Sequence, residues 1–387
     1  MNILRVTPSL DPELGGPPTT IVNAAIAEHK AGMQATIVFT GDELSAVSTR
    51  PARSRLAAAG VRTLMFPHAS GLPRSLASRW GVSRQLTVWL LRHVRAYDVV
   101  HVDFVWAWST ISAALAGSIA RRPVVMTAHE SLTNYGIRTR SGSDNHGAWL
   151  WSLAKRSVRR ILMRHVALIV MTSDMEYTDS VRASERAVVI PHAVVDEPPP
   201  EPPVEPPLSP FTVGYIGRLH PKKNIDVLLR AIANLGIPVH LIVCGDGDPA
   251  YRTQLHDLAE QLCVSDRVEW RGHVDPTGRA SLFAASHVIA MPSTYECFGM
   301  AAAEAMAAGV PVIVSKTTGV APIVEKHDCG KLVEAGRVDQ LCAALADIVG
   351  DAAWRRRARL NSLRAVSATY SYDSYGSQIG AAYAGFG

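Results

Sequence analysis

Cysteine is scarce in this 387-residue chain, and its arrangement argues against two kinds of stabilising site. There are five cysteines, an odd number, and they are widely spaced without a Cys-x2-Cys pair. Such spacing favours neither a disulfide framework nor a zinc site. We therefore expect a protein of the reducing cytoplasm.

Long apolar runs and a strong charge imbalance are also lacking. No uncharged apolar segment reaches 18 residues, so no membrane-spanning helix is predicted. The start, Met1 to Val6, reads as a short strand before a Pro/Gly loop, and no signal peptide is expected. Lys and Arg exceed Asp and Glu by only 39 − 34 = 5, which favours anionic ligands without indicating nucleic acid.

Apolar residues make up 48% of the chain and charged ones 19%, which fits an α/β protein and argues against disorder. In the first half, short apolar runs typical of strands alternate with helical stretches. This alternation predicts a mostly parallel sheet covered on both faces, a doubly wound half. The runs are 2–7, 35–40, 61–66, 98–102, 123–128, 167–172 and 187–190.

A proline-rich stretch, Glu197 to Pro210, interrupts this pattern. It cannot hold a regular helix or sheet, so it is predicted to be an extended linker between domains, with an SH3-type ligand as the alternative. The pattern then restarts. The second half has strand-like runs at 211–217, 239–244, 268–272 and 288–291.

The most informative stretch begins at Pro292. Residues 300–308 are all Ala or Met except Glu304, and they are bounded by Gly299 and Gly309, which predicts a buried helix. A carboxylate on such a helix needs hydroxyl or cationic partners. Eight positions earlier, Glu296 should lie at the carboxyl end of a strand, where open α/β sheets bind ligands.

The start of that helix also suits an anion. Gly299 lets backbone approach closely, and the first N–H groups of the helix lie at the positive end of its dipole. Two carboxylates beside an anion site indicate a ligand that has both hydroxyl and phosphate groups. A nucleotide sugar has both.

Two loops that follow strands carry charged or imidazole groups. Arg218 and Lys223 follow the first strand of the second half, and two such cations can stabilise a departing diphosphate without a metal. In the first half, His101 and His129 lie at strand ends. His101 is read as structural. His129 lies at the expected ligand edge of the sheet.

Several weaker patterns remain open. Gly15-Gly16, in the loop before a helix predicted from Thr19 to Ala31, could touch a phosphate or sugar, or form a plain turn. Asp246-x-Asp248 is read as a structural Gly turn, so no metal is assigned. The polar loop 131–146, with Tyr135 and Arg138, suits acceptor binding. The basic, Trp-bearing helix predicted at 149–166 has two readings, contact with an anionic bilayer and a solvated face.

The string of residues around the two carboxylates has a known counterpart. The spacing of Glu296 and Glu304, with Phe298-Gly299, Gly309 and Pro311-Val312, resembles the donor-site signature of retaining glycosyltransferases of the GT-B fold, family 4. The family usually continues with Gly-Gly-x-Pro-Glu, but this chain reads Thr318-Gly-Val-Ala-Pro322. The resemblance therefore does not carry the sugar-side contacts of that loop over to this chain.

The resemblance implies an α/β GT-B fold, with two Rossmann-like doubly wound domains facing a cleft. It also implies a metal-independent, retaining transfer of a sugar from a nucleotide diphosphate sugar. The acceptor would be a glycan or lipid-linked molecule in cell-surface polysaccharide or glycolipid synthesis, and the protein would work in the cytoplasm or at the inner face of the membrane. The predicted domains are 1–197 for the acceptor, a linker 198–210, 211–370 for the nucleotide sugar, and a helix 371–387 that crosses back.

The same resemblance implies roles for individual residues. Glu296 and His129 would contact the transferred sugar, and a loop at His273 would hold the nucleobase through main-chain groups. The residues implied in donor binding are Gly16, Arg218, Lys223, His273, Phe298, Gly299, Met300 and Glu304. Two rivals use the same residues: a sugar-nucleotide epimerase of GT-B fold, which consumes donor without acceptor, and a silent sugar-nucleotide-binding subunit.

Overall fold

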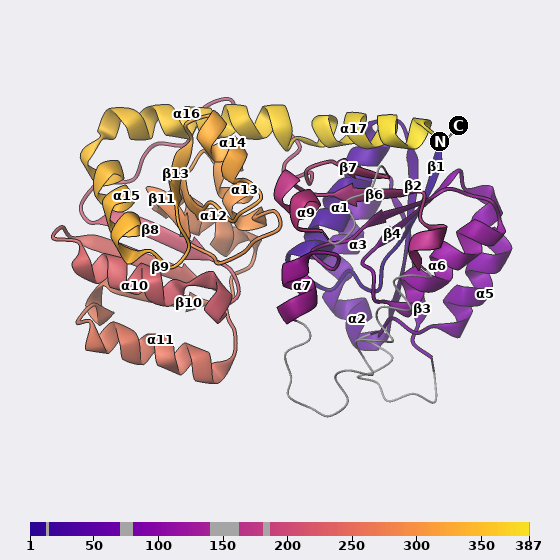
Figure 1. Ribbon diagram of the computed structural model, residues 1–387, viewed down its shortest axis with the longest axis horizontal. Coiled ribbons are helices and arrows are strands. Elements are labelled where there is room, and N and C mark those ends of the chain that lie inside the picture. Colours follow the sequence, from indigo (N-terminus) through magenta and orange to yellow (C-terminus); the bar gives the residue numbers. More distant parts are fainter. Residues whose placement is uncertain (13–14, 70–79, 140–161, 181–185, 387) are drawn as a thin grey trace. The chain divides into compact units, whose positions relative to one another are not determined.

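The computed structural model describes residues 1–12, 15–69, 80–139, 162–180 and 186–386 (Figure 1). The chain forms two compact units. The N-terminal unit comprises residues 1–196 together with 372–387, and the C-terminal unit comprises residues 197–371. Residues 372–387 thus belong to the same unit as residues 1–196, although the other unit, residues 197–371, separates them in the sequence.

The N-terminal unit is built on a seven-stranded, all-parallel sheet in the order β3-β2-β1-β4-β5-β6-β7. Each predicted strand is confirmed to within one residue at either end. The order reverses between β1 and β4, which makes their carboxyl ends the switch point where doubly wound sheets bind ligands. The strands are β1 (Asn2–Val6), β2 (Gln34–Gly41), β3 (Arg62–Pro67), β4 (Val99–Asp103), β5 (Val124–Thr127), β6 (Leu168–Met171) and β7 (Ala187–Val189).

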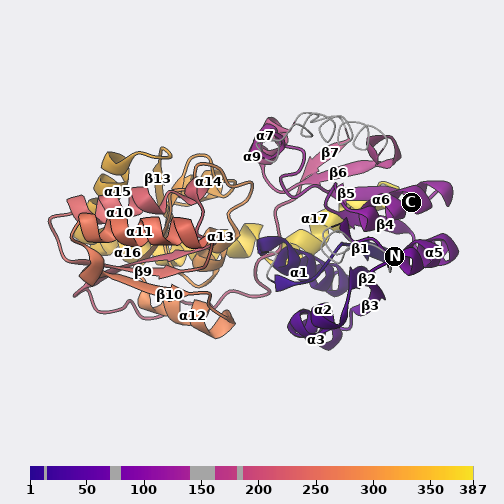
Figure 2. The ribbon, with the colours of Figure 1, turned by 90° about the horizontal axis from the view of Figure 1, so that it is seen from below.

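Alternation along β1 sends its side chains into two separate cores. Ile3 belongs to a core with α1 and α17, whereas Leu4 and Val6 belong to a core with α5 and α6. Arg5 shares the face of Ile3 and is therefore directed under α1 and α17. Figures 1 and 2 show α17 lying along α1. The helices are α1 (Gly16–Lys30), α2 (Glu43–Ser48), α3 (Arg50–Ala58), α5 (Arg84–His93), α6 (Trp108–Ile119), α7 (Asn134–Thr139), α9 (Asp174–Asp179) and α17 (Tyr372–Ala384).

The C-terminal unit has a six-stranded, all-parallel sheet in the order β10-β9-β8-β11-β12-β13. Its switch point lies between β8 and β11. The strands are β8 (Phe211–Ile216), β9 (Val239–Cys244), β10 (Val268–Gly272), β11 (Val288–Met291), β12 (Val312–Ser315) and β13 (Gly330–Val333). The helices are α10 (Ile225–Asn234), α11 (Pro249–Gln261), α12 (Pro276–Ala285), α13 (Met300–Ala307), α14 (Ala321–Lys326), α15 (Val338–Gly350) and α16 (Ala352–Thr369).

The proline-rich stretch 198–210 forms neither helix nor strand, and it is part of the C-terminal unit. Arg355 Nε donates to Glu205 at 2.6 Å, and Arg359 donates to the carbonyl of Pro203 at 2.8 Å. Both arginines are at least 95% buried. The basic start of α16 is therefore used to hold this stretch.

Two predictions about local structure need correction. The helix expected from Thr19 begins at Gly16, because Pro17 and Pro18 occupy its first turn, where the missing N–H is no loss. The polar loop 131–146 contains a helix, α7, over Asn134–Thr139. Most of the basic helix predicted at 149–166 lies outside the described residues. Among the helices that the structure describes, none is both long and apolar enough to cross a membrane.

Candidate functional site

The loops after β8 and β11 meet at the switch point of the C-terminal unit. The N–H of Thr294 donates to the carbonyl of Lys222 at 2.7 Å, and Asn224 Nδ2 donates to the carbonyl of Pro292 at 2.7 Å. Lys223 and Glu296 form an ion pair across the two loops. The structure thus brings together two residues that are 73 positions apart in the sequence.

The Lys223–Glu296 pair is mostly enclosed, with 12% of the lysine and 15% of the glutamate side chain exposed. Burial by itself would raise the pKa of Glu296, but Lys223 and Lys222 outweigh burial and leave that pKa below its ordinary value. Glu296 is therefore an anion at neutral pH. It can accept hydrogen bonds from hydroxyl groups.

Arg218 contrasts with Lys223. Its side chain is exposed, and within the described parts of the chain it forms no ion pair. The backbone at Arg218 is held by β8, because the hydroxyl of the buried Tyr215 in that strand donates to the carbonyl of Arg218 at 3.2 Å. The strand end therefore presents a guanidinium that is available to an anion.

Asn224 explains how this loop is held. The backbone of Asn224 is left-handed, with φ of 53°, a conformation that asparagine tolerates better than most residues. Its side chain also makes the bond to Pro292 that joins the two loops. A glycine could supply the conformation but not the bond.

We expect Asn224→Ala to lower the free energy of unfolding of the C-terminal unit by about 1–2 kcal/mol, because it loses the cross-loop bond and strains the backbone. Asn224→Gly is the matched control, since it keeps the left-handed conformation and loses only the side-chain hydrogen bonds to Pro292 and Thr294. Urea unfolding of both variants should therefore place Gly between wild type and Ala. An alanine variant as stable as the glycine variant would contradict the role of backbone conformation.

The predicted buried helix is confirmed as α13, and the loop before it packs on the loop after β12. The N–H of Gly319 donates to the carbonyl of Glu296 at 2.9 Å. A Cβ on Gly319 would lie 2.1 Å from the carbonyl oxygen of Cys297, so only glycine fits there. Gly299 caps the helix with φ of 99°. Gly319 lies in the segment Thr318–Pro322, which differs from the usual family pattern. Close packing explains why this position still has a glycine.

The start of α13 offers N–H donors. By helix geometry the N–H groups of Met300 and Ala301 have no intrahelical acceptor, and no described residue accepts from them. The ring of Phe298, in contrast, is 95% buried and packs edge-on against Tyr370, with ring centroids 5.2 Å apart. The ring of Phe298 therefore anchors the loop, and a ligand could meet this residue only at its main chain.

Glu304 has a cationic partner, one of the two kinds of partner, hydroxyl or cationic, that were expected from the sequence. Arg279 Nη1 in α12 donates to both carboxylate oxygens of Glu304 at 2.7 Å. Nothing in the sequence singled out Arg279, because it lies 25 positions away on another helix. His273, predicted to mark the nucleobase loop, is exposed just before α12.

Both carboxylates of the Asp246-x-Asp248 turn stabilise the local fold. Asp248 caps α11 by accepting from the N–H groups of Ala250 and Tyr251, and Asp246 pairs with Arg252 at 3.1 Å. Both carboxylates are therefore engaged within the fold. Among the described residues no group of three or more His, Cys, Asp or Glu side chains could hold a metal ion.

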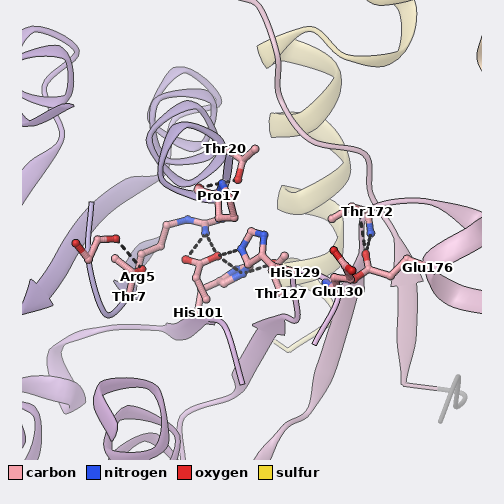
Figure 3. Close-up of polar contacts among 12 residues, drawn as sticks. Arg5, Thr7, Pro17, Thr20, His101, Thr127, His129, Glu130, Thr172 and Glu176 are labelled. Atoms are coloured by element: carbon pink, nitrogen blue, oxygen red, sulfur yellow. Dashed lines mark hydrogen bonds and ion pairs between the residues drawn. The ribbon is translucent and has the colours of Figure 1, made fainter. Parts of the chain in front are cut away.

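In the N-terminal unit, His129 belongs to a buried polar cluster at the switch point (Figure 3). His129 Nε2 lies 3.2 Å from Asp103 Oδ1, and Asp103 in turn accepts from Arg5 Nη1 at 3.1 Å. The other side of the Arg5 guanidinium binds Glu28 at 2.8 Å through two bonds. All four side chains are at least 95% buried.

Helix α17 completes this cluster. The hydroxyl of Tyr375 accepts from Arg5 at 2.8 Å, and the hydroxyl of Tyr383 donates to Glu28 at 2.7 Å. Burial would raise the pKa of Asp103, but Arg5 and the bond to His129 hold it well below its usual value. Asp103 is therefore an anion, and the His129 nitrogen that faces it carries the proton.

The backbone at His129 is strained, and hydrogen bonds at a neighbouring residue fix it. His129 and Glu130 both have left-handed backbones, with φ of 46° and 69°. The N–H of Glu130 donates to the buried carboxylate of Glu176 at 2.9 Å, and Glu176 also accepts from the N–H and hydroxyl of Thr172 at 2.7 Å (Figure 3). Strain of this kind persists only where neighbours fix it, and it gathers at functional sites.

His101 is structural, as its position suggested. Its Nδ1 lies 2.6 Å from the hydroxyl of Tyr383 and its Nε2 lies 2.8 Å from that of Thr127, so both ring nitrogens are used. Burial, and then Arg5, lowers the pKa of His101 well below its ordinary value. His101 therefore stays neutral in the folded protein.

This state predicts a loss of stability in acid. Below about pH 6.5 the unfolded chain protonates His101 while the folded protein does not, so stability should fall by up to roughly 1.4 kcal/mol per pH unit from this residue. Above pH 7.5 His101 is neutral in both the folded and the unfolded state, so it should not change the slope of stability with pH. Unfolding free energies of wild type and His101→Gln, measured from pH 7.5 to 5, test this. Equal slopes in the two proteins would contradict it.

The remaining predicted residues lie in the N-terminal unit. Gly16 opens α1 and is exposed, after the left-handed Gly15. Tyr135 is half-buried in α7, and its N–H donates to Asp179 at 3.2 Å. Arg138 lies in the same helix. Their contacts with a ligand stay predictions.

Known proteins resemble this chain along most of its length. Two family models match it, one described as "Glycosyl transferase 4-like domain" over residues 15–193 and one as "Glycosyl transferases group 1" over residues 201–363. A D-inositol 3-phosphate glycosyltransferase of Mycobacterium avium is 28% identical over 319 residues, which cover 82% of this chain and 70% of that protein.

Two further comparisons concern a shorter alignment and a solved structure. An uncharacterized glycosyltransferase of Methanocaldococcus jannaschii is 33% identical over 163 residues, and the alignment spans 41% of either chain. The crystal structure of Alr3699/HepE from Anabaena in complex with UDP-glucose covers all of both chains, with a TM-score of 0.74 and 21% identity. A complex of the same protein with UDP has a TM-score of 0.73.

Proposed function

Since the chain belongs to the glycosyl transferase group 1 family and has the GT-B fold, we propose that it is a retaining glycosyltransferase that moves a sugar from a nucleoside diphosphate sugar to an acceptor hydroxyl. The observation that carries the proposal is the switch point of the C-terminal unit. There Arg218, which forms no ion pair with any described residue, the Lys223–Glu296 ion pair and the N–H groups at the start of α13 belong to the segments that follow the neighbouring strands β8 and β11.

Each of these groups has a role in the proposed transfer. When the bond between the sugar C1 and the diphosphate oxygen breaks, negative charge develops on the leaving phosphate. Arg218, Lys223 and the α13 N–H groups are placed to stabilise that charge by charge-assisted hydrogen bonds. Glu296, kept ionised by its lysines, accepts hydroxyl groups of the transferred sugar.

Retention requires the acceptor oxygen to bond to C1 on the face that the diphosphate leaves. The acceptor hydroxyl then lies beside the departing phosphate oxygen, which can take its proton. His129 is assigned to a sugar hydroxyl, because its Nε2 proton is engaged by Asp103 and its Nδ1 can accept a hydrogen bond. The acceptor itself is proposed only as a glycan or lipid-linked molecule.

The donor base is proposed from the solved relatives. The Anabaena protein was crystallised with UDP and with UDP-glucose, which supports a uridine diphosphate donor for this chain. Thermal unfolding with UDP, GDP, ADP and TDP tests this, because a ligand at 100 times its dissociation constant adds roughly 2.7 kcal/mol of stability. We expect UDP to give the largest shift. A shift with none of the four would overturn the proposed function.

The product distinguishes the proposal from its two rivals. A glycosyltransferase releases nucleoside diphosphate and forms a glycoside only when an acceptor is present. An epimerase would form a new epimer from the nucleotide sugar alone. A silent binding subunit would bind the nucleotide and consume none.

A further inference from the structure

Arg279 is the one charged side chain of α12 that reaches the carboxylate of α13. Its Nη1 donates to both oxygens of Glu304 at 2.7 Å, and the two side chains are 35% and 17% exposed. The rest of α13 is Ala and Met, so α13 itself offers Glu304 no polar side chain. The partner of this buried carboxylate therefore comes from a different helix.

We propose that Arg279 is a positioning residue that orients Glu304 for the cis-diol of a bound ribose; this inference rests on the proposed function. A carboxylate has about four acceptor positions, two on each oxygen. The single Nη1 of Arg279 uses one on each oxygen. One position on each oxygen is left, which matches the two neighbouring hydroxyls of a ribose.

The position of Arg279 in the chain supports this role. It lies in the second turn of α12, whose N-terminal cap is Asp275, and α12 directly follows the loop at His273 that is predicted to face the nucleobase. A nucleoside held between that loop and Glu304 would lie alongside Arg279. The Nε of Arg279 is also buried, and no residue that the structure describes accepts a hydrogen bond from it.

Arg279 also favours the charged form of Glu304. Burial raises the pKa of Glu304 above its ordinary value, and Arg279 offsets only part of this rise. Helix α13 packs against α16, β11, β12 and their loops, and within the described residues Arg279 is the charged group that acts on Glu304. Without it, Glu304 would take up a proton more readily. A protonated carboxyl has fewer positions to accept ribose hydroxyls.

The test compares nucleotides with and without the diol in the full-length protein. Isothermal titration at pH 7.5 measures the affinity of wild type, Arg279→Leu and Arg279→Lys for UDP and for 2′,3′-dideoxy-UDP. We expect Arg279→Leu to weaken UDP binding about tenfold and dideoxy-UDP binding less than twofold. Arg279→Lys should recover part of the loss, because it restores a cation. If GDP or ADP binds in place of UDP, that nucleotide and its dideoxy form are used.

The pH profile separates orientation from a merely structural effect. Between pH 7.5 and 5.5 the ratio of UDP to dideoxy-UDP affinity should change more in Arg279→Leu than in wild type, because Glu304 protonates earlier. Arg337→Leu is the matched control, since it removes an exposed arginine that pairs with Asp339 in the same unit; it should leave both affinities unchanged.

Three results would overturn the inference. Equal losses for the two nucleotides would place Arg279 at the phosphates or the base. Unchanged UDP affinity in Arg279→Leu would show that Glu304 needs no orientation. A fall in both affinities with a lowered melting temperature would assign Arg279 to folding. A wild-type protein that binds none of the nucleotides would instead refute the proposed function.

Discussion

Replacing Glu296 with glutamine is expected to lower the rate of sugar transfer by about a thousandfold while the protein stays folded. The amide keeps the shape of the side chain but loses the negative charge that Lys223 and Lys222 maintain. It also leaves Lys223 without its ion-pair partner. Removing a single well-placed charge or donor at a reacting centre commonly costs 10²–10³ in turnover.

Lys223→Ala should produce a loss of similar size, because it removes a cation from the leaving group and the partner of Glu296. The two residues act as a unit, so the double variant should lose much less than the product of the two single losses. Measurement of kcat with saturating donor and of circular dichroism on each variant tests this.

A matched pair exists elsewhere in the same unit. Lys316 and Glu334 form an exposed ion pair at 2.8 Å, with about half of each side chain accessible. Glu334→Gln and Lys316→Ala should leave transfer unchanged. Full activity in Glu296→Gln and Lys223→Ala would refute the assignment of the site, whatever the control pair does.

Replacing Arg5 with methionine is expected to destabilise the N-terminal unit by about 3–5 kcal/mol. Methionine fills much of the volume but supplies no charge. Glu28 and Asp103, both at least 99% buried, would then lack their cation, and the hydroxyl of Tyr375 would lose a donor. An uncompensated buried charge is among the few changes that cost this much.

The readout must be confined to one unit, because a protein of two units need not unfold in a single step. Hydrogen exchange at α1 and β4 should rise in Arg5→Met, whereas exchange at β8 and β11 should not. Lys30→Ala is the control. Lys30 lies on the same helix as Glu28, but its pair with Asp196 is almost half exposed on both sides, so about 0–1 kcal/mol is expected.

A triple variant tests whether the loss of stability comes from unpaired buried charge. Combining Arg5→Met with Glu28→Gln and Asp103→Asn removes the buried charges together, so part of the lost stability should return. Arg5→Met with stability within 1 kcal/mol of wild type would contradict the assignment of Arg5 as the central cation. A triple variant less stable than Arg5→Met would show that hydrogen-bond geometry matters more than charge.

The sequence was sufficient to predict the strands and to single out the carboxylates Glu296 and Glu304, and the reasons are local. A parallel strand buried on both faces is a short apolar run, so β9, β10 and β11 could be delimited to the residue. Glu304 was recognisable because a single charge among Ala and Met residues is costly. Its need for hydroxyl or cationic partners followed from the same fact.

The partners of these residues could not be predicted, because they are set by tertiary packing. Arg279 reaches Glu304 from another helix, and Arg5 meets Tyr375 across 370 positions. One weak signal was present: Arg5 interrupts an apolar strand and so required buried acids. The loop prediction for 131–146 failed at α7, where polarity alone did not reveal a helix of six residues.

The tyrosines of α17 have a consequence for biosynthesis. The polypeptide leaves the ribosome from its beginning to its end, so the seven-stranded sheet is made long before residues 372–384 appear. Until then Glu28 and Arg5 lack two phenol groups, and the apolar patch over α1 stays uncovered. The six-stranded unit is contiguous at 197–371, so it can finish folding before α17 is translated. The N-terminal unit, although it is synthesised earlier, stays incomplete until α17 is available.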